Sequence, residues 1–168
     1  MTVQKIILIG PMGAGKTTLG TIISERVGWP YFDNDQELQT LNQLSAIELA
    51  TLPVPELHKL EGEYLTWVMQ RPISFISGAA ASVIDYPESL ELLRDATSVY
   101  LRLPLEKLLV RTGSTGIGRQ ALLQDAERVI TQRYIRRDPL YRAVAHLTIE
   151  LGDNPIEDAE GIINILDL

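Results

Sequence analysis

The chain has 168 residues, enough for one domain with a substantial apolar core and too few for two. It contains no cysteine, which excludes disulfides, a thiol nucleophile and any cysteine-bound metal. Its formal net charge of −7 argues against general nucleic-acid binding, which needs a basic face. No apolar run is long enough to span a membrane and we see no signal peptide, so we expect a cytoplasmic protein that does not bind membranes.

Apolar runs alternate with helical segments along the whole chain. Strands are expected at residues 5–9, 31–33, 73–77, 98–103 and 146–151. Helices are expected at residues 16–27, 35–43, 56–70, 87–95, 105–111, 122–137 and 155–168, with a short helix opened by the S-x-x-E capping box at 45–48. This order predicts an α/β fold whose five-stranded parallel sheet is covered by helices on both faces. Ligands of such sheets bind beyond the carboxyl ends of the strands.

Residues 10–17 read GPMGAGKT and match the phosphate-binding P-loop, G-x-x-x-x-G-K-[ST]. They lie between an apolar, β-branched run and a segment that can form a helix, which is the context that this motif needs. The glycines let backbone N–H groups point at phosphate oxygens, and the helix N-terminus adds its dipole. We expect the lysine to reach the β- and γ-phosphates of a nucleotide and the hydroxyl that follows it to ligate Mg²⁺. The expected nucleotide-binding residues here are Gly13, Ala14, Gly15, Lys16, Thr17 and Thr18.

Asp33 and Asp35 follow the second expected strand, at the sheet edge where the P-loop also lies. In an extended segment, residues two apart point to the same side. One carboxylate could then hold Mg²⁺ and its waters, and the other could accept a proton from a substrate hydroxyl. Helix capping is the alternative explanation of this D-x-D pattern, because Asp is a favoured N-cap residue.

Arginine is concentrated between residues 111 and 142. The arginines of this segment are Arg111, Arg119, Arg128, Arg133, Arg136, Arg137 and Arg142. Such a run of charge is commonly a solvated face. Guanidinium groups, however, also bind phosphate and carboxylate through two parallel hydrogen bonds, so the preference for Arg over Lys indicates an anionic ligand.

Four motifs, taken in this order, resemble the shikimate kinase family: the P-loop, FDND at 32–35, SAIE at 45–48 and RDPLY at 137–141. The resemblance implies a three-layer α/β/α fold of the nucleoside-monophosphate-kinase type, as a single domain over residues 1–168. It implies transfer of the γ-phosphate of ATP to the 3-hydroxyl of shikimate with Mg²⁺, in aromatic amino acid biosynthesis. It also implies a monomer that acts on a small molecule, with substrate-binding helices at about 34–70 and a mobile lid at about 112–124.

The resemblance also implies roles for single residues. Lys16, Asp35 and Arg119 would be catalytic, with Asp35 as the base and Arg119 closing over the phosphates from the lid. Thr17 and Asp33 would lie in the Mg²⁺ shell, and Ser77 near a second metal-side motif. Arg111 would flank the adenine, with Asn154 and Pro155 on its other side. The expected acceptor-binding residues are Asp35, His58, Gly78, Ala79, Ala80 and Arg137, the last of which would contact the substrate carboxylate.

Two departures from the family pattern fall on the acceptor side. The family has F-R-x-x-E on the helix at 56–70, where this chain has LHKLE at 57–61, so His58 replaces the arginine. A neutral imidazole lacks the paired hydrogen bonds of a guanidinium. The family's triple glycine is replaced by alanine at 79–81, and alanine resists positive φ. Glu61, on the apolar face of its helix, needs a partner, which could be His58 or Arg137.

These departures leave alternatives open on the acceptor side. A kinase of the same type could act on a different sugar or polyol. A nucleotide-binding regulator without catalysis is the rival from another class of protein. The catalytic and metal-side residues that the chain keeps (Lys16, Thr17, Asp33 and Asp35) argue against that regulator, because a pure binder needs no acceptor-side carboxylate.

Overall fold

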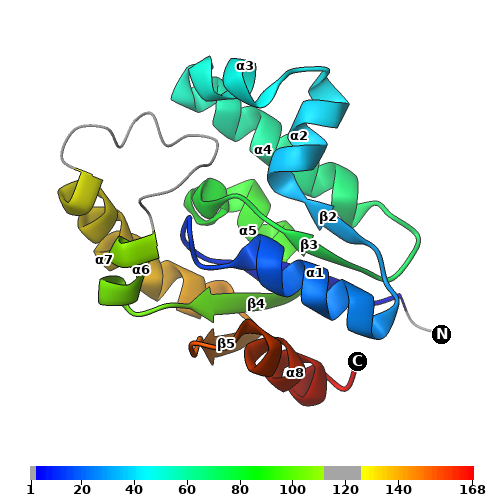
Figure 1. The fold of residues 1–168 in the computed structure, drawn as a ribbon. Coiled ribbons are helices and arrows are strands. Elements are labelled where there is room, and N and C mark those ends of the chain that lie inside the picture. The colour runs from blue at the N-terminus through cyan, green and yellow to red at the C-terminus, as the bar shows by residue number, and fades with distance from the viewer. Residues whose placement is uncertain (1–2, 112–125) are drawn as a thin grey trace.

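The computed structural model describes residues 3–111 and 126–168, and its centre is a parallel sheet with strand order β2-β3-β1-β4-β5 (Figure 1). The strands are β1 (Lys5–Ile9), β2 (Tyr31–Asp33), β3 (Phe75–Gly78), β4 (Thr97–Arg102) and β5 (Leu147–Glu150). The helices are α1 (Lys16–Val27), α2 (Asn34–Asn42), α3 (Ala46–Thr51), α4 (Val54–Met69), α5 (Pro87–Arg94), α6 (Leu105–Arg111), α7 (Ala126–Val144) and α8 (Pro155–Leu166), with a 3-10 helix η1 (Ala81–Asp85). The α/β class and the five-stranded parallel sheet predicted from the sequence are confirmed.

Alternate side chains of the central strand β1 enter two separate cores, one on each face of the sheet. Ile7 and Ile9 pack with buried residues of α4, α5 and α7, whereas Ile6 and Leu8 pack with buried residues of α1 and α8. Burial on both faces explains why β1 reads as a continuous apolar run instead of an alternating one. Helices α1 and α8 lie side by side on one face of the sheet (Figure 1). None of the helices in the described part of the chain is both long and apolar enough to cross a membrane.

The register of the strands brings three strand ends together. Leu8 of β1 and Asp33 of β2 are both level with Gly78 of β3. The loop that follows β1, the acidic residues that follow β2 and the alanine run that follows β3 therefore leave the sheet at one place. This edge is where parallel α/β sheets bind their ligands.

Two features between residues 79 and 144 differ from the sequence-based expectation. α7 continues through Pro139 to Val144, so the predicted end at residue 137 is wrong. An internal proline costs a helix about 3 kcal/mol, but Tyr141 and Val144 are buried beyond it, and burial of such side chains is worth about 1.5–3 kcal/mol each. The short helix η1 was not predicted, because five residues are too few for a periodic pattern.

Tyr31 fills the space between α1 and the end of β3. A Cβ atom on Gly20 of α1 would overlap the Tyr31 ring, and one on Gly78 would lie 2.6 Å from the Tyr31 hydroxyl. Both positions therefore need glycine to admit the ring. The Tyr31 hydroxyl in turn donates a hydrogen bond to Asp33 Oδ2 at 3.2 Å, so this packing also supports the acidic residue at the strand end.

The packing of Tyr31 predicts that Gly20→Ala destabilises the protein. The added methyl group would overlap the ring, and such overpacking costs about 1–3 kcal/mol of unfolding free energy in urea denaturation. Gly62→Ala is the matched control, because Gly62 lies inside α4 and a methyl group added there would meet no atom within 4 Å, so it should instead stabilise by about 0.4–1 kcal/mol. Equal effects of the two substitutions would contradict the packing described for Tyr31.

Candidate active site

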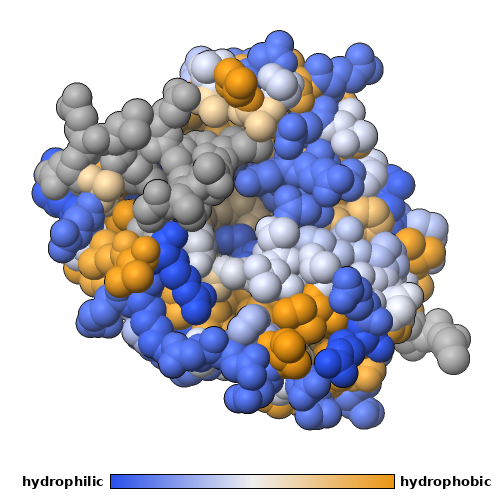
Figure 2. Space-filling view, viewed as in Figure 1, coloured by the Kyte–Doolittle hydropathy of each residue, from blue (hydrophilic) through white to orange (hydrophobic). Residues whose placement is uncertain are grey.

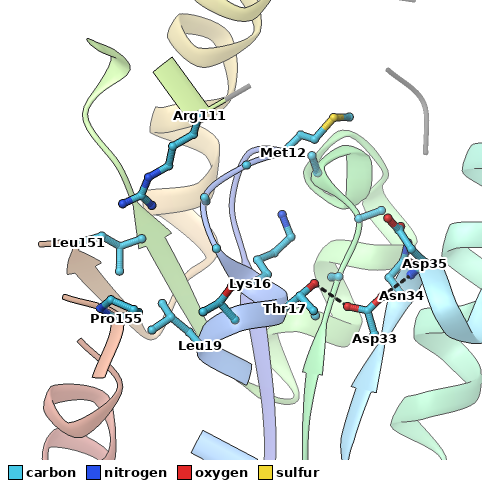
Figure 3. Close-up of a pocket in the computed structure, with 18 of the residues that line it drawn as sticks. Met12, Lys16, Thr17, Leu19, Asp33, Asn34, Asp35, Arg111, Leu151 and Pro155 are labelled. Carbon is cyan, nitrogen blue, oxygen red and sulfur yellow. Dashed lines mark hydrogen bonds between the residues drawn. The ribbon is translucent and has the colours of Figure 1, made fainter. Parts of the chain in front are cut away.

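A cleft of about 630 Å³ opens at the carboxyl edge of the sheet. Figure 2 shows this face of the molecule hollowed near its centre, with hydrophilic surface at the bottom of the hollow. In Figure 3, Arg111, Leu151 and Pro155 lie on one side of the P-loop, and Asp33, Asn34 and Asp35 lie on the other. The cleft therefore has two ends with the phosphate-binding loop between them. Gly13, Ala14, Gly15, Lys16, Thr17 and Thr18 all line it.

The P-loop owes its shape to backbone that only glycine adopts easily. Gly10 has a φ of 147° and Gly15, at the N-cap of α1, has a φ of 103°. A Cβ atom on Gly10 would also lie 2.9 Å from the carbonyl oxygen of Leu101 in β4. The loop is therefore held close to the sheet, with the N-terminus of α1 facing the cleft.

Lys16 extends from the first turn of α1 into the cleft (Figure 3). Its ammonium group donates to the carbonyl oxygens of Gly10 at 2.8 Å and Pro11 at 2.9 Å. Burial lowers the pKa of Lys16 to about 8, although the charges of Asp35 and Asp33 act in the opposite direction. A bound anion would favour the charged form of this lysine.

The Asp33 carboxylate joins the P-loop to the next helix. Its Oδ2 accepts a hydrogen bond from the Thr17 hydroxyl at 2.7 Å (Figure 3). Its Oδ1 caps α2 by accepting from the backbone N–H groups of Asp35 at 3.0 Å and Gln36 at 3.2 Å. The capping alternative therefore applies to one oxygen, while the other oxygen contacts the residue expected to ligate Mg²⁺.

Asp35 lies in the first turn of α2 instead of on an extended segment, so the expected strand-like relation between Asp33 and Asp35 is wrong. Asp35 is exposed at the cleft and accepts a hydrogen bond from the Asn34 amide at 3.1 Å. Asn34, for which the sequence suggested no role, also lines the cleft. Its Oδ1 is buried and has no hydrogen-bond partner among the described residues.

The opposite end of the cleft is formed by α6 and the loop between β5 and α8. Arg111, Leu151, Gly152 and Pro155 line it. Asn154 does not, because its side chain caps α8, accepting from the Ile156 N–H at 3.0 Å. Arg119 and the segment 112–124, expected to form the lid, lie outside the described residues.

Glu61 projects from α4 into the cleft beyond the P-loop. It accepts a hydrogen bond from the Ser82 hydroxyl of η1, so the predicted pairing with His58 or Arg137 is wrong. Burial raises the pKa of Glu61 to about 7, against the lowering effect of the Ser82 hydrogen bond. Ser82 could not be found from the sequence, because its partner lies 21 residues away on another element.

The two residues expected to bind a substrate carboxylate do not line this cleft. His58 forms a hydrogen bond through Nδ1 with the Tyr86 hydroxyl and faces a groove between α4 and α5. Arg137 donates from Nε at 3.1 Å and from Nη2 at 2.6 Å to Asp85 Oδ2. Burial and the charge of Arg137 lower the pKa of His58, which disfavours its charged form.

The alanine run after β3 is not strained. Among the described residues, only Gln43 and Asp167 combine a positive φ with a side chain, so the expected conflict between alanine and a glycine conformation is absent. Gly78, Ala79, Ala80 and Ala81 line the cleft. The Ala79 N–H, however, donates to the Leu8 carbonyl oxygen at 3.0 Å, which continues the sheet.

Ser77 lies just before this run, buried within β3. Its Oγ lies 2.7 Å from the Tyr64 hydroxyl, and it does not line the cleft. A role beside the metal, as expected from the sequence, therefore has no support in its position.

Comparisons with known proteins agree with this geometry. The shikimate kinase family model matches residues 12–167. The shikimate kinase of Neisseria gonorrhoeae is 33% identical over 157 residues, which cover 87% of this chain and 86% of that protein. The structure of shikimate kinase from Acinetobacter baumannii in complex with shikimate superimposes with a TM-score of 0.90 at 28% identity, covering 98% of this chain and 93% of that one. The structure from Bacteroides thetaiotaomicron gives a TM-score of 0.86 at 23% identity over 99% of this chain and 100% of that one. The chain therefore belongs to the shikimate kinase family.

Proposed function

We propose that this protein transfers the γ-phosphate of ATP to the 3-hydroxyl of shikimate, giving shikimate 3-phosphate and ADP. One observation carries the proposal: the phosphate-binding loop and the carboxylates of Asp33 and Asp35 line a single cleft in a chain of the shikimate kinase family. The related structure that holds shikimate supports the choice of acceptor.

Thr17 and Asp33 fit an Mg²⁺ ion by their chemistry. The Thr17 hydroxyl and Asp33 Oδ2 lie 2.7 Å apart at the start of α1, and both are oxygen ligands of the kind that Mg²⁺ prefers. When bound with ATP, the ion supplies positive charge to the β- and γ-phosphate oxygens. The protein's own part is to hold these two oxygens in place, which the second oxygen of Asp33 does by capping α2.

Lys16 and Asp35 divide the remaining chemistry. Lys16 stabilises the negative charge of the transferred phosphoryl group, and Asp35 orients the acceptor hydroxyl and accepts its proton. The two side chains line the same cleft, and the charge of Asp35 raises the pKa of Lys16 against the effect of burial. In this proposal, Arg119 and the lid at 112–124 close over the phosphates, Arg111 and Pro155 flank the adenine, and residues 34–70 form the acceptor-binding segment.

A kinase that acts on a different polyol or sugar is the second candidate. Neither His58 nor Arg137 lines the cleft, and Arg137 is already paired with Asp85. An uncharged acceptor would need no cation there. A regulator without catalysis is the weakest candidate, because Lys16 and Asp35 both line the cleft.

We further propose that the protein works as a monomer in the cytoplasm. The described residues of a single chain supply Lys16, Asp33 and Asp35 to the cleft, and these are groups that the proposed reaction uses. The cytoplasm is also where a kinase meets ATP.

The proposed activity predicts that shikimate accelerates ADP release well above the rate without an acceptor. A coupled ADP assay with shikimate, quinate, gluconate and inositol tests this, and NMR of the product identifies the phosphorylated oxygen. Turnover of a neutral polyol but not of shikimate would favour the second candidate. No acceleration by any acceptor would contradict the kinase assignment.

The proposed base predicts that Asp35→Asn lowers kcat by about 10²–10⁴-fold, because the amide cannot accept the acceptor's proton. The affinity for ADP, measured by calorimetry, should be nearly unchanged. Asp95→Asn is the matched control, because Asp95 is exposed at the end of α5, away from the cleft. An Asp35→Asn variant with the kcat of the parent protein would show that this carboxylate is not the base.

The lowered pKa of Lys16 predicts that nucleotide binding takes up a proton near pH 8. In the free protein about half of the Lys16 side chains are neutral at that pH, and the bound phosphates raise the pKa again. Affinity should therefore fall as the pH rises above 8, and proton uptake should become small at pH 6.5. Calorimetry of ADP binding in two buffers of different ionisation enthalpy measures the uptake. Lys16→Arg, which stays charged throughout, should lose it, and equal uptake by this variant would contradict the assignment to Lys16.

A further inference from the structure

Three guanidinium groups of α7 lie around one carboxylate. Arg136 donates to both oxygens of Asp85, at 2.8 Å to Oδ1 and 3.0 Å to Oδ2, and Arg137 donates twice to Oδ2. Arg133, one turn earlier on α7, forms no hydrogen bond or ion pair with any described residue. The cluster therefore holds more positive than negative charge, and Asp85 forms its ion pairs with Arg136 and Arg137.

Arg133 and Arg137 both line a small cavity beside the main cleft, although neither lines the cleft itself. They are four residues apart and so lie on one side of the helix. The cavity has a volume of about 50 Å³ and shares Met12 and Ala81 with the main cleft. Ala81 ends the alanine run that follows β3, so this cavity adjoins the part of the main cleft that the alanine run lines.

The surroundings of Arg133 favour a bound anion. It is half-buried, and burial together with the charges of Arg137 and Arg136 lowers its pKa, while Asp85 acts in the opposite direction. Arg137 also influences the charges of Lys16 and Glu61, two residues that line the cleft. A carboxylate placed between Arg133 and Arg137 would relieve their mutual repulsion.

We propose that Arg133 binds the carboxylate of the acceptor together with Arg137, and so supplies the second cation that His58, which contacts Tyr86 outside the cleft, does not provide. The proposal rests on the proposed function, because it assumes a carboxylate-bearing acceptor. Asp85 takes the Nε and Nη2 side of Arg137, which leaves Nη1 of that guanidinium for the ligand. In this proposal, two successive turns of α7 bind the carboxylate, in place of the arginine that the family carries at the position of His58 on α4.

The test is Arg133→Gln, assayed with shikimate and with its neutral carboxamide. Loss of a charge-assisted hydrogen bond predicts a rise of about 10- to 100-fold in KM for shikimate, with little change in KM for ATP. The preference for shikimate over the carboxamide should fall by a similar factor. Arg142→Gln is the matched control, because Arg142 lies on the same helix, half-exposed, and pairs with Asp138. Arg133→Lys, which keeps the charge but not the planar fork, should give an intermediate KM and carries the test if the Gln variant does not fold.

The outcomes separate this proposal from the activity on which it rests. Unchanged KM for shikimate in an active Arg133 variant would overturn the role of Arg133 alone. A raised KM for ATP with unchanged KM for shikimate would mean that Arg133 serves the phosphates instead, and would also overturn it. Parent protein that turns over no carboxylate-bearing acceptor would overturn the proposed function and this proposal with it.

Discussion

The carboxylate of Asp33 forms the hydrogen bonds that connect the start of α1, the strand β2 and the start of α2 at the cleft. One oxygen caps α2, and the other accepts from the hydroxyls of Thr17 on α1 and Tyr31 on β2. The start of α1 is thus linked to the end of β2 and the start of α2, which lie 16 or more residues later in the sequence. The geometry depends on the parallel sheet, which brings the ends of β1, β2 and β3 to the same level. It also depends on the absence of side chains at Gly20 and Gly78, which admits the Tyr31 ring.

Features that depend on neighbouring residues could be predicted from the sequence. The apolar run of β1 and the glycine spacing of the P-loop each encode their conformation over a few positions. The capping box of α3 is another such feature, since the Ser45 N–H donates to Glu48 at 2.7 Å and the Glu48 N–H donates back to the Ser45 hydroxyl at 3.2 Å. The alternation of such elements was sufficient to predict the sheet and its ligand-binding edge, because parallel α/β chains have few ways to fold.

Features that depend on contacts between distant segments could not be predicted. The partners of Glu61, His58 and Arg137 all come from residues 82–86, a stretch whose helical turn is too short to leave a periodic pattern. The length of α7 was missed for a related reason. Pro139 predicts from the local sequence that the helix ends before it. The helix continues because Tyr141 and Val144, beyond the proline, are buried in the tertiary structure. The P-loop was therefore easier to predict than the surroundings of Glu61, His58 and Arg137, since backbone conformation forms the loop and long-range side-chain pairs form those surroundings.

The contrast between backbone conformation and side-chain pairs suggests which part of the cleft can accept substitutions without a change of fold. The phosphate-binding loop uses backbone N–H groups and glycine conformations, so few substitutions there leave it intact. Side chains of α4 and η1 line the cleft beyond this loop, and side chains of α7 line the small cavity beside it. A chain with a net charge of −7 can still carry a local surplus of positive charge, because two arginines of α7 pair with the single carboxylate of Asp85 and Arg133 lies near them. Under the proposed function, this local surplus, and not the overall charge of the chain, would attract an acceptor that carries a carboxylate.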